Sequence, residues 1–285
     1  VRGDLDPNGA YLSILDGQNT LNQAMAIEDS SYVTVQDLSI RNFVDDASGV
    51  GAGGAVRPEF GIIDILDSRN ITLRHNRSIN LNAVGINGTD INVSGAVGLQ
   101  LLRNYVMSAA ATLVGIVNID GSVQVDDVIR ENTLIMSTPT VAIAADVRTH
   151  LAINGMKNVT IRSNYMGMVS GYDTAFGTPL AGLFLANVQN ATIQGNVLYD
   201  LPTTSAGTYL GYVGADGCNG ICNEKHTVSH NLFYKASANT NTTFIGYVNL
   251  FGSGGCRASQ FFNNAFVSAS PSANDTAFNL TCIGT

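Results

Sequence analysis

Apolar and polar residues alternate along many short stretches of this chain, four to six residues at a time, as in Val159–Ile161 and Ala191–Ile193. A period of two is typical of a β-strand, in which successive side chains point to opposite faces. The spacing of an amphipathic helix is not sustained anywhere in the sequence. The pattern therefore predicts an all-β protein built from many short strands.

One motif recurs along the chain, in the form Asn-Val-Thr-Ile-x-x-Asn at 158–164 and in related forms elsewhere. An apolar strand precedes the motif, as at Gly61–Leu66, and another follows it, as at Tyr165–Val169. Three short strands per unit without intervening helices define the coil of a β-helix. The closing Asn residues lie 28, 28, 32, 32, 35 and 32 positions apart, and they are Asn76, Asn104, Asn132, Asn164, Asn196, Asn231 and Asn263. Such a regular period predicts a solenoid, and we expect one domain over residues 1–285, a single-stranded right-handed parallel β-helix of about eight coils.

The closing Asn of the motif has a structural reason to recur. Asn tolerates the left-handed backbone conformation that a sharp turn between strands requires. Its side-chain amide can also bond to the Asn of the next coil, as in stacked amide ladders. We therefore predict that the seven Asn residues form an internal ladder and do not bind a ligand.

With this repeat pattern the chain resembles the pectate-lyase-like right-handed β-helix superfamily over nearly its whole length. The resemblance implies a fold shared by polysaccharide lyases, glycoside hydrolases, epimerases, phage tailspikes, adhesins and surface structural proteins, so it does not select a function. In pectate lyases one outer face carries Asp residues that hold calcium and an Arg that acts as base. The diagnostic motifs Asn-Thr-Asp and Arg-Ile-Lys are absent here. We expect no cofactor, and calcium only if the chain is an enzyme of this kind.

The candidate catalytic residues are Asp146, Arg148 and His150, because alternation along one strand would place all three on one side. An acid, a cation and an imidazole together could serve proton abstraction. The competing interpretation is a surface ion pair beside a solvated His. Two adjacent carboxylates, Asp126 and Asp127, fall at a corner between strands, where turn residues are expected.

The charge balance limits the partners. The net charge is −8, with only 14 Lys and Arg residues, which argues against nucleic acid and anionic membranes and disfavours acidic polysaccharides. No run approaches the roughly 18 apolar residues of a membrane span.

Asn-x-Ser/Thr sequons and cysteines point to an extracellular setting. Besides Asn76, which we assign to the ladder, the sequons predict glycosylation at Asn70, Asn87, Asn92, Asn158, Asn190, Asn241, Asn274 and Asn279. The four cysteines are Cys218, Cys222, Cys256 and Cys282. Three pairings are open, and we favour 218–222 with 256–282. A zinc site is the weaker alternative, because no second close Cys or His pair completes it, so no metal site is predicted.

Neither end of the chain shows a capping helix, although the end of a β-helix exposes unpaired backbone groups. Either the segment belongs to a longer chain or copies of itself cover the ends. The leading hypothesis is an extracellular, glycosylated structural protein that associates end to end or side by side into a filament, coat or appendage at the cell surface. The alternatives are a polysaccharide-active enzyme (lyase, hydrolase or epimerase) and a carbohydrate-binding adhesin or tailspike segment that uses Tyr209, Tyr212 and Tyr247.

Overall fold

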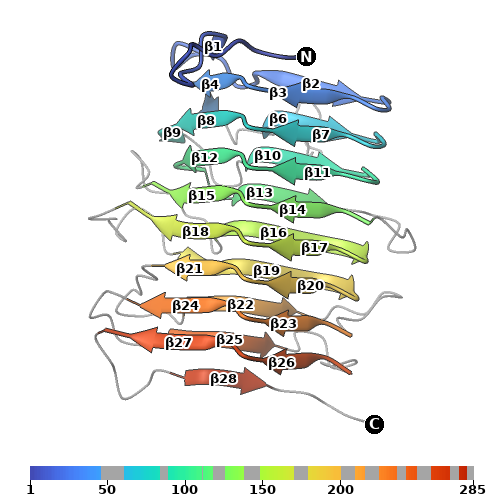
Figure 1. Ribbon diagram of the computed structural model, residues 1–285, viewed down its shortest axis with the longest axis vertical. Coiled ribbons are helices and arrows are strands. Elements are labelled where there is room, and N and C mark those ends of the chain that lie inside the picture. The colour runs from blue at the N-terminus through green and yellow to red at the C-terminus, as the bar shows by residue number, and fades with distance from the viewer. Residues whose placement is uncertain are drawn as a thin grey trace, which may run out of the picture.

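The chain forms a right-handed parallel β-helix, as the repeat predicts, in which strands of successive coils stack along one axis into three parallel sheets (Figure 1). The computed structural model describes residues 1–45, 61–83, 89–110, 112–117, 126–137, 148–169, 179–199, 209–215, 225–235, 242–248, 258–269 and 276–280. Every regular element within these ranges is a strand, and none of them contains a helix that could cross a membrane.

Each coil contributes one strand to each sheet in turn. The first sheet contains β2 (Met25–Glu28), β6 (Gly61–Leu66), β10 (Thr89–Ser94), β13 (Thr112–Val117), β16 (Arg148–Lys157), β19 (Pro179–Gln189), β22 (Tyr209–Ala215), β25 (Thr242–Val248) and β28 (Thr276–Leu280). The second sheet contains β3 (Thr34–Gln36), β7 (Thr72–Arg74), β11 (Gln100–Leu102), β14 (Val128–Arg130), β17 (Thr160–Arg162), β20 (Thr192–Gln194), β23 (Thr227–Ser229) and β26 (Gln260–Phe262). The third sheet contains β1 (Ile14–Asp16), β4 (Ser39–Arg41), β8 (Arg77–Asn80), β12 (Tyr105–Ser108), β15 (Thr133–Met136), β18 (Tyr165–Met168), β21 (Val197–Tyr199), β24 (Leu232–Lys235) and β27 (Ala265–Ser268). A fourth, two-stranded sheet pairs β5 (Val44–Asp45) with β9 (Asn82–Ala83).

The strands of the second sheet show why the alternation fixes the register. Each has three residues, of which the middle one faces the interior and its two neighbours face outward. A slip of one residue would expose the apolar side chain, so burial selects a single alignment. The buried middle residues stack from coil to coil as Val35, Leu73, Leu101, Ile129, Ile161, Ile193 and Val228.

A left-handed residue forms the corner between the second and third sheets. His75 has φ 53° and Glu131 has φ 59°, and each directly precedes a ladder residue, Asn76 or Asn132. The ladder Asn residues themselves are not among those with positive φ. Our prediction that the closing Asn takes the left-handed conformation was therefore wrong by one residue: the residue before it reverses the backbone, and this reversal turns the Asn side chain inward.

The buried Asn side chains form a continuous hydrogen-bonded ladder. The Oδ1 of Asn132 accepts the backbone N–H of Asn104 at 2.8 Å and its Nδ2–H at 3.1 Å. The Nδ2 of Asn132 in turn donates to the Leu101 carbonyl at 2.8 Å and to the Oδ1 of Asn164 at 3.0 Å. The same pattern runs from Asn76 through Asn104, Asn132, Asn164 and Asn196 to Asn231.

In the last coil the ladder passes through Asn264 and not through Asn263. The Nδ2 of Asn231 donates to the Oδ1 of Asn264 at 2.9 Å, whereas Asn263 is exposed and holds the left-handed corner position with φ 54°. Ladder residues lie four positions after the first residue of their second-sheet strand, and counting from Gln260 gives Asn264. The assignment of Asn263 to the ladder was therefore wrong by one position.

Residues 1–13, which we call the N-terminal arm, lie along the edge of the second and third sheets. Arg2 pairs in parallel with Gln36 of β3, and the backbone N–H of Gly3 donates to the Gln36 carbonyl at 2.8 Å. The arm then turns back through an antiparallel bridge between Leu5 and Tyr11. It thereby places the Arg2 side chain over the corner between the second and third sheets.

A candidate anion-binding groove

A groove of about 460 Å³ lies at the corner between the second and third sheets, beside the N-terminal arm. Four arginines line it: Arg2, Arg74, Arg103 and Arg130. Asp37 is the single carboxylate among the lining residues. The described lining therefore carries four positive charges and one negative charge, a net charge of +3 when His75 is neutral.

The strand pattern places these arginines next to one another. Arg74 is the last residue of β7 and is aligned with Leu102, which is aligned in turn with Arg130 at the end of β14. Arg103 directly follows Leu102. Since the residue before each strand-ending arginine is buried, as for Leu73 and Arg74, the arginine faces solvent.

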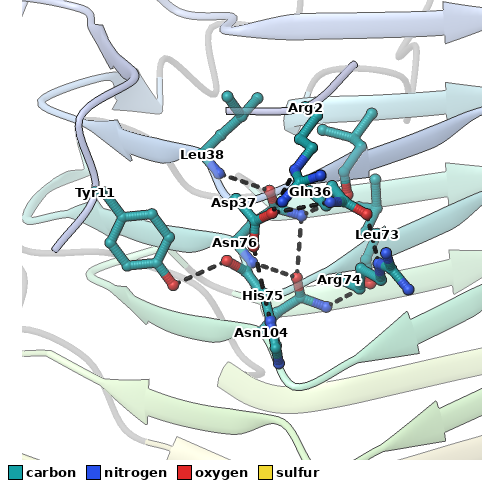
Figure 2. Close-up of polar contacts among 11 residues, drawn as sticks. Arg2, Tyr11, Gln36, Asp37, Leu38, Leu73, Arg74, His75, Asn76 and Asn104 are labelled. Atoms are coloured by element: carbon teal, nitrogen blue, oxygen red, sulfur yellow. Dashed lines mark hydrogen bonds and ion pairs between the residues drawn. The ribbon is translucent and has the colours of Figure 1, made fainter. Parts of the chain in front are cut away.

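Asp37 lies at the centre of the polar contacts in the groove (Figure 2). Its Oδ2 accepts the Nε2–H of Gln36 at 2.8 Å and lies 3.5 Å from the Nε of Arg2. The Oε1 of Gln36 accepts the Nε–H of Arg74 at 2.6 Å. The Asp37 side chain is only 9% exposed. Its ion pair with Arg2 offsets the negative charge of the carboxylate, which would otherwise repel an anion.

His75 faces Asp37 from the next coil. Its Nδ1 lies 3.7 Å from the Oδ1 of Asp37, and half of its side chain is exposed. The hydroxyl of Tyr11 donates to the His75 carbonyl at 2.8 Å, which fastens the N-terminal arm to this corner (Figure 2). Burial raises the pKa of the Tyr11 hydroxyl, Asp37 raises it further and Arg77 opposes the change.

Glu131 shows how the arginines act on a carboxylate. The Nε–H of Arg103 donates to its Oε2, and the Nε of Arg130 lies 3.4 Å from its Oε1. The hydrogen bond from Arg103 lowers the pKa of Glu131 below its usual range, and the charges of Arg103, Arg130 and Arg162 lower it further. The ionised form of a carboxylate is thus stabilised at this position.

The predicted catalytic trio is not brought together on an outer face. His150 is fully buried, and its Nε2 lies 2.7 Å from the Gly167 carbonyl. The pairing of β16 with β19 shifts register between Arg148 and Thr149, so alternation does not carry across this point. Arg148 begins β16, and Asp146 lies outside the described residues. The prediction that these three residues share a solvated face was therefore wrong for His150.

The sequons fall in different environments. Asn70 and Asn190 are exposed and Asn158 is half-buried, all three at the left-handed corner between the first and second sheets. Asn92 is 5% exposed, and its Nδ2 donates to the buried Asp64 at 3.0 Å, so it is not an accessible acceptor and its prediction as a glycosylation site was wrong. Asn279 lies on β28 without a described side chain, and Asn87, Asn241 and Asn274 lie outside the described residues.

Other predicted residues are not placed by the structure. Cys218, Cys222, Cys256 and Cys282 all lie outside the described residues, and the side chains of Tyr209, Tyr212 and Tyr247 are not described. In the described parts of the chain, no group of three or more His, Cys, Asp or Glu residues is arranged to hold a metal ion.

Sequence reasoning missed the groove although the repeat contained its signal. The two positions before the ladder Asn are Arg74 and His75 in one coil, and Arg103, Arg130 and Arg162 occupy these positions in the next three. Aligned repeats stack equivalent residues, so the motif itself implied a row of cations. The net charge of −8 gives no sign of this row, because it sums the charges of the whole chain and does not report how they are distributed.

Comparisons with known proteins add no family assignment. No family model matches the chain, and no curated protein matches it. Among solved structures, the chain is similar to the Azotobacter vinelandii mannuronan C-5 epimerase AlgE4 A-module, at 12% identity and a TM-score of 0.37, over 100% of this chain and 88% of that chain. It is also similar to the catalytic domain of a GH87 alpha-1,3-glucanase in complex with nigerose, at 11% identity and a TM-score of 0.28, over 98% of this chain and 62% of that chain. At these TM-scores the assignment of the fold rests on the three parallel sheets of the chain itself.

Proposed function

We propose that this protein binds an acidic carbohydrate through the arginine-lined groove. The observation that carries the proposal is the convergence of Arg2, Arg74, Arg103 and Arg130 on one groove, where the arginines outnumber the lining carboxylate Asp37 and the neighbouring Glu131 that pairs with Arg103 and Arg130. Guanidinium groups recognise carboxylate and sulfate groups through paired hydrogen bonds. The proposal departs from our expectation that acidic polysaccharides are disfavoured, because local charge and not net charge governs binding at a groove.

The proposal is tested by affinity for an immobilised polyuronate compared with a neutral glucan at low ionic strength. We expect retention on the polyuronate, release by salt and no retention on the glucan. Arg74→Gln and Arg130→Gln should each weaken binding about tenfold, since a hydrogen bond to a charged group contributes about 1.5 kcal/mol. Arg69→Gln is the matched control, because Arg69 is also exposed and lies just before the opposite end of β7. Equal losses in all three variants, or equal retention on both polymers, would refute the proposal.

A second candidate function is proton abstraction from a bound uronate, which one observation favours. His75 and Asp37 face each other at 3.7 Å in the same groove as the arginines. A base beside cations that neutralise the substrate carboxylate is what removal of the C5 proton requires. In such an elimination His75 would take the C5 proton, the C4–O4 bond would break and a C4=C5 double bond would form in the new terminal sugar, while the released O4 takes a proton from water.

The enzymatic candidate predicts new ultraviolet absorbance from unsaturated uronate when the protein is incubated with a polyuronate. His75→Gln should abolish the absorbance while binding is kept. Binding without any product would leave the first proposal and eliminate the second.

We also propose that Asn70 and Asn190 carry N-linked glycans and that the protein is extracellular. Their exposed side chains at a corner support the acceptor role. The amide of Asn190 donates to the Oδ1 of Asn158 at 2.6 Å, and one coil spacing separates the two residues, so a glycan on Asn190 leaves little room for one on Asn158. Glycopeptide mass spectrometry of material from the native source tests this assignment. The predicted end-to-end or side-by-side association stays a prediction.

A further inference from the structure

The arginines of the groove belong to a longer row that follows the axis of the solenoid. Backbone register aligns Arg74, Leu102, Arg130 and Arg162 at the ends of four neighbouring strands. In the coil of Leu102 the next residue, Arg103, supplies the cation. Four consecutive coils therefore present one arginine each, all exposed, and we call Arg74, Arg103, Arg130 and Arg162 the arginine row.

Strand spacing sets the period of the row. Neighbouring strands lie about 4.8 Å apart, so the row extends over roughly 14 Å along the axis. Arg162 lies beyond the groove itself, whose lining ends at Arg130. Its charge nevertheless stabilises the ionised Glu131 together with Arg103 and Arg130, so the last three arginines act on one region of the surface.

The row has defined ends. In the coil after Arg162 the equivalent positions hold Gln194 and Gly195, which are uncharged. In the coil before Arg74 they hold Gln36 and Asp37, where Asp37 is paired with Arg2. The positive surface is therefore about four coils long, which limits the length of ligand that it can bind.

We infer that the arginine row binds a linear polyuronate along the solenoid axis, with about one carboxylate per coil and about four sugars engaged. This inference rests on the proposed function and adds the orientation and length of the ligand. A polyuronate carries one carboxylate on each sugar, which suits a row with one arginine on each coil. Glu131 pairs with Arg103 and Arg130, so a sugar carboxylate at these two arginines has to compete with it. A single-stranded nucleic acid is disfavoured, because no Phe, Tyr or Trp occupies the described positions of the row to stack on its bases.

Calorimetric titration with a uronate monomer, dimer, tetramer and hexamer tests the inference. We expect affinity to rise at least tenfold from dimer to tetramer and to change little from tetramer to hexamer. Arg162→Gln should weaken tetramer binding about three- to tenfold and leave dimer binding unchanged, whereas Arg69→Gln should change neither.

The possible failures are distinguishable. If tetramer and dimer bind equally and Arg162→Gln has no effect, while Arg74→Gln still weakens binding, the axial row is wrong and the groove remains. If no acidic saccharide binds, the proposed function fails as well. If single-stranded DNA of matched charge binds as tightly as the tetramer, the inference of a polyuronate is overturned.

Discussion

At the scale of single residues, Asn132 connects three coils of the solenoid. Its amide oxygen accepts two hydrogen bonds from Asn104, and its amide nitrogen donates to Leu101 and Asn164. All of these groups are buried. Buried amide groups are costly to leave without partners, so removing one side chain affects both neighbouring coils.

Asn132→Ala should therefore lower the free energy of unfolding by about 2–4 kcal/mol, because it leaves buried donors and acceptors on both sides unpaired. The midpoint of urea unfolding measures the effect. Asn8→Ala is the matched control, since Asn8 is exposed in the N-terminal arm, and it should change the midpoint little. An Asn132→Ala midpoint equal to that of the control would contradict a stabilising ladder.

Asp127 is a buried carboxyl group with an incomplete set of partners. Its Oδ1 accepts the N–H of Leu99 at 2.8 Å, while its Oδ2 has no partner among the described residues. Burial raises the pKa of Asp127 to about 7, against the lowering effect of the N–H groups of Leu99 and Gly98, and the neighbouring Asp126 contributes to the rise. The folded protein therefore holds this proton more tightly than the unfolded chain does.

This pKa predicts how stability depends on pH. The raised value means that the stabilising contribution of the protonated carboxyl is complete below about pH 4, near the pKa of Asp in an unfolded chain, and is lost as the pH rises to about 7. The loss amounts to up to about 4 kcal/mol, since a pKa difference of one corresponds to about 1.4 kcal/mol. Asp127→Asn should flatten the dependence of the urea midpoint between pH 4 and 8. An unchanged profile in this variant would show that Asp127 is not the titrating group.

At the scale of elements, the alternation of apolar and polar residues determines which face of each strand points into the core. In β15 the buried Leu134 faces the core and the half-buried Ile135 faces outward. Leu134→Ala should cost about 2–5 kcal/mol of stability because it leaves a cavity, and Ile135→Ala should cost clearly less. Thermal and urea unfolding of the two variants measure the difference. A larger loss for Ile135→Ala would mean that β15 is shifted by one residue, and equal losses would contradict the alternation.

The sequence predicted regular coils well and irregular ones poorly. Period-two patterns and the recurring Asn located the second sheet, because strands such as β7, β14 and β17 bury one residue between two more exposed ones. The two errors have different causes. Asn263 was chosen over Asn264 because two Asn residues are adjacent in a coil whose register is regular, whereas His150 follows the irregularity between Arg148 and Thr149. Alternation can be extrapolated only along an uninterrupted strand.

At the scale of the whole molecule, stacking of equivalent residues converts a sequence repeat into a charged surface. An arginine at nearly the same motif position in four successive coils becomes a continuous cationic row on a protein whose net charge is −8. This arrangement could have been predicted from aligned repeats. The contribution of Arg2 could not, because it depends on the N-terminal arm lying against β3.

The most direct measurement is a crystal structure of the protein with a bound uronate tetramer. We predict that the ligand lies along the solenoid axis, with its carboxylates within hydrogen-bonding distance of the guanidinium groups of the arginine row, which are those of Arg74, Arg103, Arg130 and Arg162. A tetramer bound on the outer face of the first or third sheet, away from these arginines, would contradict the account.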